Sequence, residues 1–571
     1  MNTSHINIVQ GRITTSRLVI IICFASVSFL NCTKKSSGSN PPSPPPPANF
    51  SMNILSVDGI SNASDFINTN TSPAIKISFT APLKNTSVPP AVSFTTKAGT
   101  VVVFNTSFQN SDSTLIITPA AALNFLTRYT VAIATTLKSK SEGQLQNAVS
   151  FSLFTKLDST DKFPRITDDA LLTLIQQQTF KYFWDFAHPI SGLARERNTS
   201  GDLVTSGGSG FGIMAIVTAI HRNFILKSEG LARIQKIVGF LKNNAQKFHG
   251  AFPHWLNGAT GVVIPFSTKD NGADLVETSY LIQGLLTARQ YFIGTDALET
   301  SLRNDINTIC NGVEWNWFRQ NNQNVLYWHW SENYNWEMNH QIKGWNECLI
   351  TYALAASSPT YSIPKIVYDN GWASNGGMKN NNLYYGIQLP LGPSLGGPLF
   401  FAHYSFLGIN PNNLSDTYAN YFTQNKNHTL INYNYCKANP KNYFGYSDSV
   451  WGLTASDIQN GYTASSPTND IGVIAPTAAL SSFPYTPIES MQALKFFYYK
   501  LGDRIWKEYG FVDAFSLHDP WFANSFLAID QGPIIVMIEN YRSGLLWNLF
   551  TSCPEVKTAM KNFGFQAPYL Q

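Results

Sequence analysis

The sequence is poor in charge and in cysteine. Asp, Glu, Lys and Arg together make up 13% of the 571 residues, about half the ~25% that is usual for globular proteins. The formal net charge is only +4, so a nucleic-acid backbone is not expected as a partner. Beyond the N-terminal region the cysteines are Cys310, Cys348, Cys436 and Cys553. They form no CxxC or Cys/His cluster, so we expect no metal site and no cofactor. We expect four buried thiols; a disulfide in an oxidising compartment is the alternative.

Long hydrophobic runs are also missing, with one exception at the N-terminus. The run from Leu18 to Leu30 follows Arg12 and Arg17 and is too short for an ordinary transmembrane helix. It ends before Cys32, an arrangement that resembles a bacterial lipoprotein signal, although the residues just before the cysteine depart from the small-residue pattern. We therefore expect a signal peptide over residues 1–31 with lipidation of Cys32, or else simple signal cleavage. The expected cellular location is the bacterial envelope, with the protein anchored by lipid in the periplasm or outer membrane.

A Pro/Ser-rich tether and a β domain are predicted next. Residues 32–49 contain the proline run 41–47, which is typical of an extended linker. Over residues 50–157, short segments alternate apolar and polar residues with period two and are separated by Ser, Thr, Asn and Pro turns. This pattern predicts an all-β Ig-like sandwich, and the segments 79–83 and 151–155 resemble bacterial Ig-like modules of secreted enzymes. We expect a spacer; carbohydrate binding is the alternative.

From Thr167 onward the hydrophobic period becomes helical. Candidate helices lie near 209–223, 228–247, 273–293, 296–310, 338–357, 413–431, 471–481, 487–500, 532–549 and 554–563. About a dozen helices over residues 160–571 without strand alternation predict an all-α (α/α)6 toroid. We expect a monomer. The run Gly207 to Gly212 lacks the lysine of a phosphate loop and is predicted to be a tight turn into a helix that begins near Ser209.

Three acids precede an apolar helix. Asp270, Asp274 and Glu277 stand at i, i+4 and i+7, which on a helix places them on one narrow face. Unpaired acids are costly to bury, so the stripe indicates a wet cavity suited to acid/base chemistry. The alternative is a helix start that Asp274 caps while the other two acids are solvated.

Glu347 is the second candidate acid. It follows Trp345 and Asn346 and enters the apolar segment that begins at Leu349. Partial desolvation raises the pKa of a carboxyl group, so Glu347 is predicted to be a proton donor. A structural glutamate held by Arg or Asn partners is the alternative.

Aromatic residues gather in Gly- and Asn-rich segments outside the helical pattern. Flat rings there can stack on sugar faces while His or Asn side chains bond hydroxyl groups. A loop tryptophan can equally cover the core. The candidates with an aromatic or polar role are His254, Trp255, Trp328, Trp345, Asn346 and Trp451.

These segments together resemble the bacterial glucoamylase-like domain family that includes glycoside hydrolase family 144, the endo-β-1,2-glucanases. The similarity runs over most of 160–570 and rests on seven ordered segments: 182–185, 191–197, 252–255, 274–278, 344–347, 452–457 and 538–542. The resemblance implies an (α/α)6 fold and internal, anomer-inverting cleavage of β-1,2-glucan to short oligosaccharides. It places the cleft acids on Asp270, Asp274, Glu277 and Glu347.

The expected roles follow from the resemblance together with the residue types. Glu347 would donate the proton, directly or through a substrate hydroxyl, and Asp274 or a neighbouring acid would activate water. The substrate-binding residues expected in the cleft are Arg195, Phe211, His254, Trp255, Trp328, Trp345, Asn346, Trp451 and Glu539. Three alternatives stay open: a transglycosylase acting on cyclic β-1,2-glucans, a polysaccharide lyase on the same toroid, and a non-catalytic glycan-binding lipoprotein.

Overall fold

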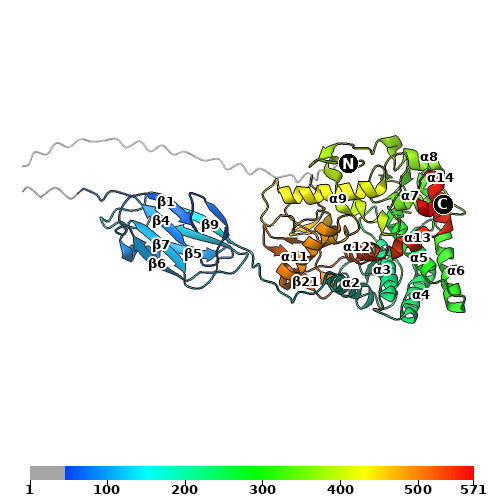
Figure 1. The fold of residues 1–571 in the computed structure, drawn as a ribbon, viewed down its shortest axis with the longest axis horizontal. Helices are drawn as coiled ribbons and strands as arrows, with labels where there is room; N and C mark the ends of the chain where they lie inside the picture. The colour runs from blue at the N-terminus through cyan, green and yellow to red at the C-terminus, as the bar shows by residue number, and fades with distance from the viewer. Residues whose placement is uncertain (1–44) are drawn as a thin grey trace, which may run out of the picture.

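The computed structural model describes residues 45–571 as an all-β lobe followed by a larger, mostly helical lobe (Figure 1). The predicted signal peptide, Cys32 and most of the tether lie outside these residues. Within the described range, no helix has both the length and the apolar character needed to cross a membrane.

The first lobe is a two-sheet sandwich, in agreement with the period-two pattern. One sheet has the order β2-β1-β4-β7-β6 and the other β3-β9-β8-β5, with β3 and β9 parallel. Inward-facing residues such as Ile77, Val131 and Leu153 form a separate hydrophobic core. The strands are Met52–Val57 (β1), Ile60–Ser61 (β2), Asp65–Thr69 (β3), Ile75–Phe79 (β4), Val92–Thr96 (β5), Phe104–Gln109 (β6), Thr114–Pro119 (β7), Arg128–Ile133 (β8) and Val149–Thr155 (β9), with the short helix Val88–Ala91 (α1) before β5.

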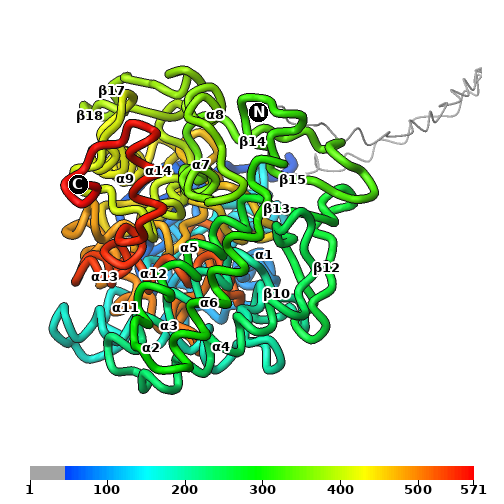
Figure 2. Tube along the Cα trace, turned by 90° about the vertical axis from the view of Figure 1, so that its right-hand side faces the viewer, coloured from blue at the N-terminus to red at the C-terminus, as the bar shows by residue number. Residues whose placement is uncertain are grey.

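The second lobe is built from helices joined by long loops. They are Asp168–Trp184 (α2), Ser206–His221 (α3), Lys227–Asn243 (α4), Leu275–Tyr291 (α5), Ala297–Asn311 (α6), Leu349–Ser357 (α7), Lys365–Asn370 (α8), Tyr421–Ala438 (α9), Pro476–Leu480 (α10), Pro487–Ile505 (α11), Ala528–Arg542 (α12), Leu545–Thr551 (α13) and Pro554–Phe563 (α14). Helices α3, α5, α7 and α12 are buried over most of their length, whereas α4, α6 and α14 bury a single stripe. In Figure 2, α5 and α12 lie near the middle of the lobe and α2 and α4 near its edge.

Glycines allow α3 and α5 to cross in close contact. A Cβ atom on Gly210 would lie 2.1 Å from the carbonyl oxygen of Tyr280, and one on Gly284 would lie 2.2 Å from the carbonyl oxygen of Gly210. The run from Gly207 to Gly212 is therefore the first two turns of α3 and not a turn before it, which corrects the prediction from sequence. Glycine is disfavoured inside a helix, but here the contact with the neighbouring backbone requires it.

Two other helix predictions were wrong. The segment 338–357 is helical only from Leu349, because residues 339–347 form a loop that includes a two-residue strand and Gly344 at a φ of +85°. The segment 532–549 is two helices, α12 and α13, separated at Gly544, which has a φ of +71°. The segment between α6 and α7 also contains short strands that the helical pattern does not reveal.

The two lobes meet through an apolar contact. Leu126 and Phe154 of the sandwich belong to the hydrophobic core of the helical lobe. The ring of Phe154 packs edge-on against Phe444 with 4.7 Å between centroids, and the Arg128 guanidinium carbon lies 4.6 Å from the Phe154 centroid. This packing ties the Ig-like domain to the helical domain.

Candidate active site

The acids predicted as a helical stripe converge, but not on one helix face. Asp270 lies in the loop before α5 and forms a β-bridge with Ser267. Asp274 is the N-cap of α5, and only Glu277 is inside the helix. The i, i+4, i+7 spacing therefore does not reflect one continuous helix. Asp274 caps the helix, as the alternative expected, but Asp270 and Glu277 are buried and not solvated.

Asp274 is held by the start of α5 and by a short hairpin. Its Oδ1 accepts hydrogen bonds from the backbone N–H groups of Val276 and Glu277 at 3.0 and 2.9 Å, as an N-cap carboxylate should. The strand Ala273–Asp274 (β13) pairs with His329–Trp330 (β15), with Asp274 opposite His329. The His329 Nε2 atom consequently lies 3.4 Å from Asp270 Oδ2 and 3.7 Å from Asp274 Oδ2.

Glu277 is fixed against the first turn of α3. Its Oε2 accepts hydrogen bonds from the Gly207 N–H at 2.8 Å and from the Thr205 hydroxyl at 3.2 Å. A Cβ atom on Gly207 would lie 2.5 Å from this oxygen, so glycine is needed there for the carboxylate to approach.

His254 connects these acids electrostatically. Its Nδ1 lies 3.2 Å from Asp274 Oδ2 and its Nε2 lies 3.9 Å from Glu277 Oε1, while its ring stacks on Phe266 at 4.2 Å. Burial alone would lower the pKa of His254, but the negative charge of Glu277 and the hydrogen bond to Asp274 raise it to about 9. At neutral pH this imidazole is therefore a cation. We call His254, Asp270, Asp274, Glu277 and His329 the first acid cluster.

The carboxyl groups of this cluster differ in their affinity for protons. Burial opposes the charge on Asp274, yet the contact with protonated His254, whose Nδ1 lies 3.2 Å from Oδ2, brings the pKa of Asp274 below its usual value. Burial and the negative charge of Asp274 raise the pKa of Asp270 to about 7. Burial also raises the pKa of Glu277. Asp274 is thus the member held most firmly as an anion.

Glu347 lies just before α7 and is mostly buried. Burial, with a smaller contribution from the charges on Asp274 and Glu277, raises the pKa of Glu347 to about 7. Within residues 45–571 no Lys, Arg or His nitrogen lies within 4.0 Å of its carboxyl group in an ion pair. The expectation of a desolvated carboxyl group agrees with this environment, whereas an arginine-held structural glutamate does not.

The donor atoms of His254, Asp270 and Asp274 all lie within 4.8 Å of one another, a spacing that could hold a metal ion. In the absence of a metal, protonated His254 neutralises part of the charge of the two carboxylates. A metal would require that proton to leave.

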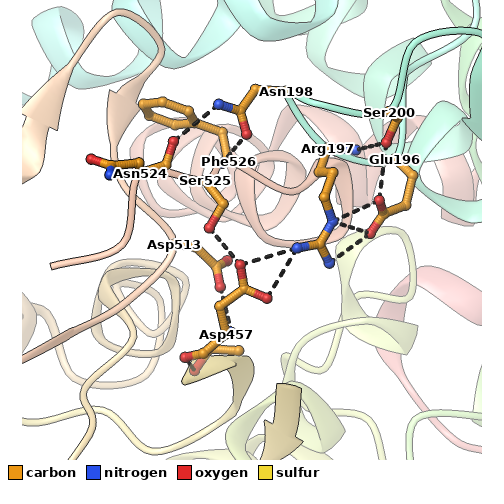
Figure 3. Close-up of polar contacts among 10 residues, drawn as sticks. Glu196, Arg197, Asn198, Ser200, Asp457, Asp513, Asn524, Ser525 and Phe526 are labelled. Carbon is orange, nitrogen blue, oxygen red and sulfur yellow. Dashed lines mark hydrogen bonds and ion pairs between the residues drawn. The ribbon is translucent and has the colours of Figure 1, made fainter. Parts of the chain in front are cut away.

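A second group of acids surrounds Arg197 (Figure 3). The guanidinium group bonds Glu196 through Nε at 2.9 Å and Asp457 through Nη1 at 3.1 Å. The Ser525 hydroxyl donates to Asp457 Oδ2, and the Asp457 N–H donates to Asp513 Oδ2 at 2.7 Å. Arg197 therefore links the loop after α2 to the segment between α9 and α10 that carries Asp457.

Asp513 and Asp530 complete this group. Burial and the negative charge of Asp457 raise the pKa of Asp513 to about 7, and burial together with Asp513 raises that of Asp530 well above its usual range. Asp513 Oδ1 and both Asp530 carboxyl oxygens are buried without a hydrogen-bond partner. We call Glu196, Arg197, Asp457, Asp513 and Asp530 the second acid cluster.

Tyr404 packs on α3 and α5. Its ring lies against Phe211 and Tyr280 at 5.4 and 5.7 Å, and burial raises the pKa of its hydroxyl. The starts of α3 and α12 also meet: the Gly207 N–H donates to Glu277, and a Cβ atom on Gly208 would lie 2.6 Å from the Cβ of Ala528, in the helix that carries Asp530. The two clusters therefore belong to one region of the helical lobe.

Several predicted binding residues have structural roles instead. Phe211 is fully buried between Tyr280 and Tyr404, and Trp451 is fully buried with its Nε1 donating to the Glu489 carbonyl. Neither presents a ring to a cleft, so both assignments are corrected to packing.

Glu539 and Arg195 are also corrected. Glu539 is fully buried and pairs with Arg222 at 2.6 Å, beyond the C-terminal end of α3, whereas the first acid cluster lies at the N-terminal end of that helix. The Arg195 guanidinium donates to the carbonyls of Gly201 and Phe186, so it fixes a loop. The neighbouring Arg197 is the arginine of the acid cluster.

The remaining predicted residues divide in two. Trp255 and Trp328 are partly buried beside His254 and His329, with ring centroids 5.7 and 5.8 Å apart, so they stay candidates for substrate contact. Trp345 is 5% exposed and packs on Trp372. The Asn346 side chain accepts from the Cys348 N–H and the Trp372 Nε1, which positions the residue next to Glu347.

Sequence reasoning missed Asp513 and Asp530. Each is a lone acid in an apolar stretch, 511–515 and 526–530. An isolated acid in such a stretch is a signal of a buried carboxyl group, but no spacing connects these two residues with Asp457 or with each other.

Comparison with known proteins identifies the family. Residues 339–554 match the family model described as putative glucoamylase, and residues 52–155 match the bacterial Ig-like domain. The endo-β-1,2-glucanase structure from Chitinophaga pinensis, a complex with sophorotriose and glucose, is 52% identical over 71% of this chain and 100% of that chain, with a TM-score of 0.69. The chain belongs to the glucoamylase-like glycoside hydrolase family 144.

Two further relatives come from Parabacteroides distasonis. A β-1,2-glucanase structure is 37% identical over 90% of the present chain and 73% of the relative's chain, with a TM-score of 0.68. An exo β-1,2-glucooligosaccharide sophorohydrolase acting at the non-reducing end is 48% identical over 419 residues, which are 69% of this chain and 58% of the relative. The match therefore spans little more than half the length of that relative.

Proposed function

We propose that this protein is a glycoside hydrolase that cleaves β-1,2-glucan internally into short oligosaccharides with inversion of the anomeric centre. The observation that carries the proposal is the opposite tuning of two buried acids: the pKa of Glu347 is raised to about 7 and that of Asp274 is lowered. Carboxyl groups whose environments separate their pKa values mark the acid and the base of a glycosidase.

In the proposed reaction, Glu347 donates a proton to the leaving oxygen, directly or through a substrate hydroxyl. Asp274 accepts a proton from the attacking water. Its Oδ1 is occupied by the helix N–H groups, so the proton would go to Oδ2, which is buried beside His254 and holds no hydrogen bond from the backbone. Inversion requires that the water fit between the two acids.

The relatives support the choice of substrate. Three of them are named for action on β-1,2-linked glucans. The relative named as endo-acting is matched over its whole chain, whereas the exo-acting relative is matched over 58% of its length. The proposal of internal cleavage follows the relative that is matched over its whole chain.

A linkage panel tests the proposal. Wild type and Glu347→Gln are incubated with β-1,2-, β-1,3- and β-1,4-glucans, and the products are read by chromatography and by proton NMR of the first anomer formed. We expect α-anomeric oligosaccharides of several lengths from β-1,2-glucan only. Cleavage of another linkage would overturn the substrate, release of a single disaccharide from chain ends would overturn internal cleavage, and a β-anomer or transfer products would overturn inversion.

We also propose an architecture for the helical domain and a cellular location. Helices α7, α5, α3, α12 and α10 contact one another in that order, which supports a closed (α/α)6 ring. The signal-like N-terminus supports lipidation at Cys32 and attachment of a monomer to the envelope membrane.

A further inference from the structure

A cavity of about 570 Å³ opens beside the second acid cluster. Its lining includes Arg197, Asp457, Tyr462, Trp521, Asn524 and Ser525. Aromatic rings next to a few polar and charged groups are the usual lining of a small-molecule site. None of the sequence signals pointed to Tyr462 or Trp521.

A hairpin positions Tyr462 over the acids. The strands Ala455–Ile458 (β19) and Gly461–Ala464 (β20) pair so that Tyr462 lies directly opposite Asp457, and directly opposed residues project on the same face. Asp457 is fixed by Arg197 and Ser525. The hairpin face that carries Tyr462 is therefore anchored on the second acid cluster.

Tyr462 keeps an open ring. It exposes 49% of its surface, and it takes part in none of the close aromatic pairs found within residues 45–571. The neighbouring Phe522, by contrast, packs on Phe515 and under Arg504. The ring of Tyr462 is free to accept a flat apolar face, and polar groups stand around it to meet hydroxyls.

The lining of the cavity adjoins the reaction centre through the start of α12. Arg197 forms a β-bridge with Leu527, and the Ala528 N–H donates to the Glu196 carbonyl at 2.9 Å. Thr205 and Gly207 bond Glu277, and the adjacent Gly208 faces Ala528 in the helix that carries Asp530. A glucan held at the first cluster can therefore extend toward Tyr462.

We propose that this cavity is a glucosyl-binding subsite remote from the cleaved bond, in which Tyr462 stacks on the sugar while Asp457 and Asn524 meet its hydroxyls. This inference rests on the proposed function and deepens it. A remote subsite adds binding only for chains long enough to reach it, so it favours polymer over short oligosaccharides and governs product length.

The test compares Tyr462→Ala, Tyr462→Phe and Tyr541→Ala. Tyr541 is a matched control because it is 44% exposed in a separate hollow beside Arg222 and Arg542. The measurements are kcat/KM on short and long β-1,2-gluco-oligosaccharides, product-length distribution on polymer, and equilibrium binding of both oligosaccharides in the Glu347→Gln background.

We expect Tyr462→Ala to lower kcat/KM and affinity for the long oligosaccharide about tenfold, as loss of an aromatic stacking contact does. The short oligosaccharide should be unaffected, Tyr462→Phe should behave as wild type because the ring remains, and Tyr541→Ala should change nothing. Equal losses on both lengths, or none, would overturn the subsite.

Failure of the proposed function gives a different result. If wild type cleaves no β-1,2-glucan, the catalytic proposal is wrong, and the binding measurement still decides the subsite. A long oligosaccharide that binds Glu347→Gln with an affinity dependent on the Tyr462 ring supports the subsite; one that does not bind overturns it.

Discussion

The Nδ1 atom of His254 lies 3.2 Å from Oδ2 of Asp274. The histidine gains a partner that stabilises its protonated form, and the aspartate gains a partner that stabilises its ionised form. The pair keeps Asp274 charged in a buried setting, where an uncompensated carboxylate would otherwise take up a proton.

The interaction between His254 and Asp274 should make the free energy of unfolding decrease at alkaline pH. Its pKa is about 9 in the folded protein, above the ordinary 6.5. The stabilisation is therefore complete below about pH 6.5 and is lost as pH rises through about 9. Urea unfolding across this range should show the decline, and His254→Gln should remove it. His221→Gln, an exposed histidine at the other end of α3, should keep the wild-type dependence; an unchanged slope in His254→Gln would refute the pairing.

Glu347→Gln should lower kcat by ~10²–10⁴, the usual worth of a general acid. Glu347 must be protonated to act and its pKa is about 7, so the wild-type rate should fall as pH rises through about 7. The residual rate of the variant should not show this decrease. Glu337→Gln is the control, because Glu337 is exposed and pairs with Lys269. Full activity in Glu347→Gln would exclude the role.

Gly284→Ala should destabilise the protein by ~1–3 kcal/mol, the cost of overpacking, because its Cβ would meet the Gly210 backbone at 2.2 Å. Gly239→Ala in α4 is the control. Its Cβ would meet nothing within 4 Å, so this change should stabilise by ~0.5–1 kcal/mol. Urea unfolding of both variants checks the prediction; equal effects would mean that the crossing tolerates a methyl group.

An all-β domain, a helical domain and half of the acids could be predicted from the sequence. Hydrophobic periods of two and 3.6 separated the Ig-like domain from the helical domain, because each reflects a buried face of a regular element. The acids 270–277 and Glu347 were found because they precede apolar helices. The second acid cluster was not predictable, because Asp457, Asp513 and Asp530 meet only through tertiary contacts, and a glycine run that serves a helix crossing reads locally as a turn.

The contact between the lobes predicts a change in shape when it is removed. Phe154→Ala takes away the ring that packs on Phe444, so small-angle X-ray scattering should show a larger radius of gyration. Phe108→Ala, in the same domain but packed against the separate sandwich core, should leave the radius unchanged. Identical scattering from wild type and Phe154→Ala would show that other contacts hold the lobes together.

Chelation should leave the rate unaltered. Protonated His254 supplies the positive charge between the carboxylates of the first acid cluster, so dialysis against EDTA should not reduce kcat on β-1,2-glucan. A loss that Zn²⁺ or Mn²⁺ restores would instead assign His254, Asp270 and Asp274 to a metal.

The first turn of α3 has a consequence for which substitutions this protein can accept. Thr205 and Gly207 hold Glu277 on one side, and Gly208 touches Ala528, near Asp530, on the other. This turn contacts both acid clusters, and its glycines pack so closely against their neighbours that we expect a shift on one side to displace the other. Substitutions that displace this turn should alter proton transfer and glucan binding together. Variants with a new product length but an intact reaction centre are therefore expected on the β19–β20 hairpin and not in the first turn of α3.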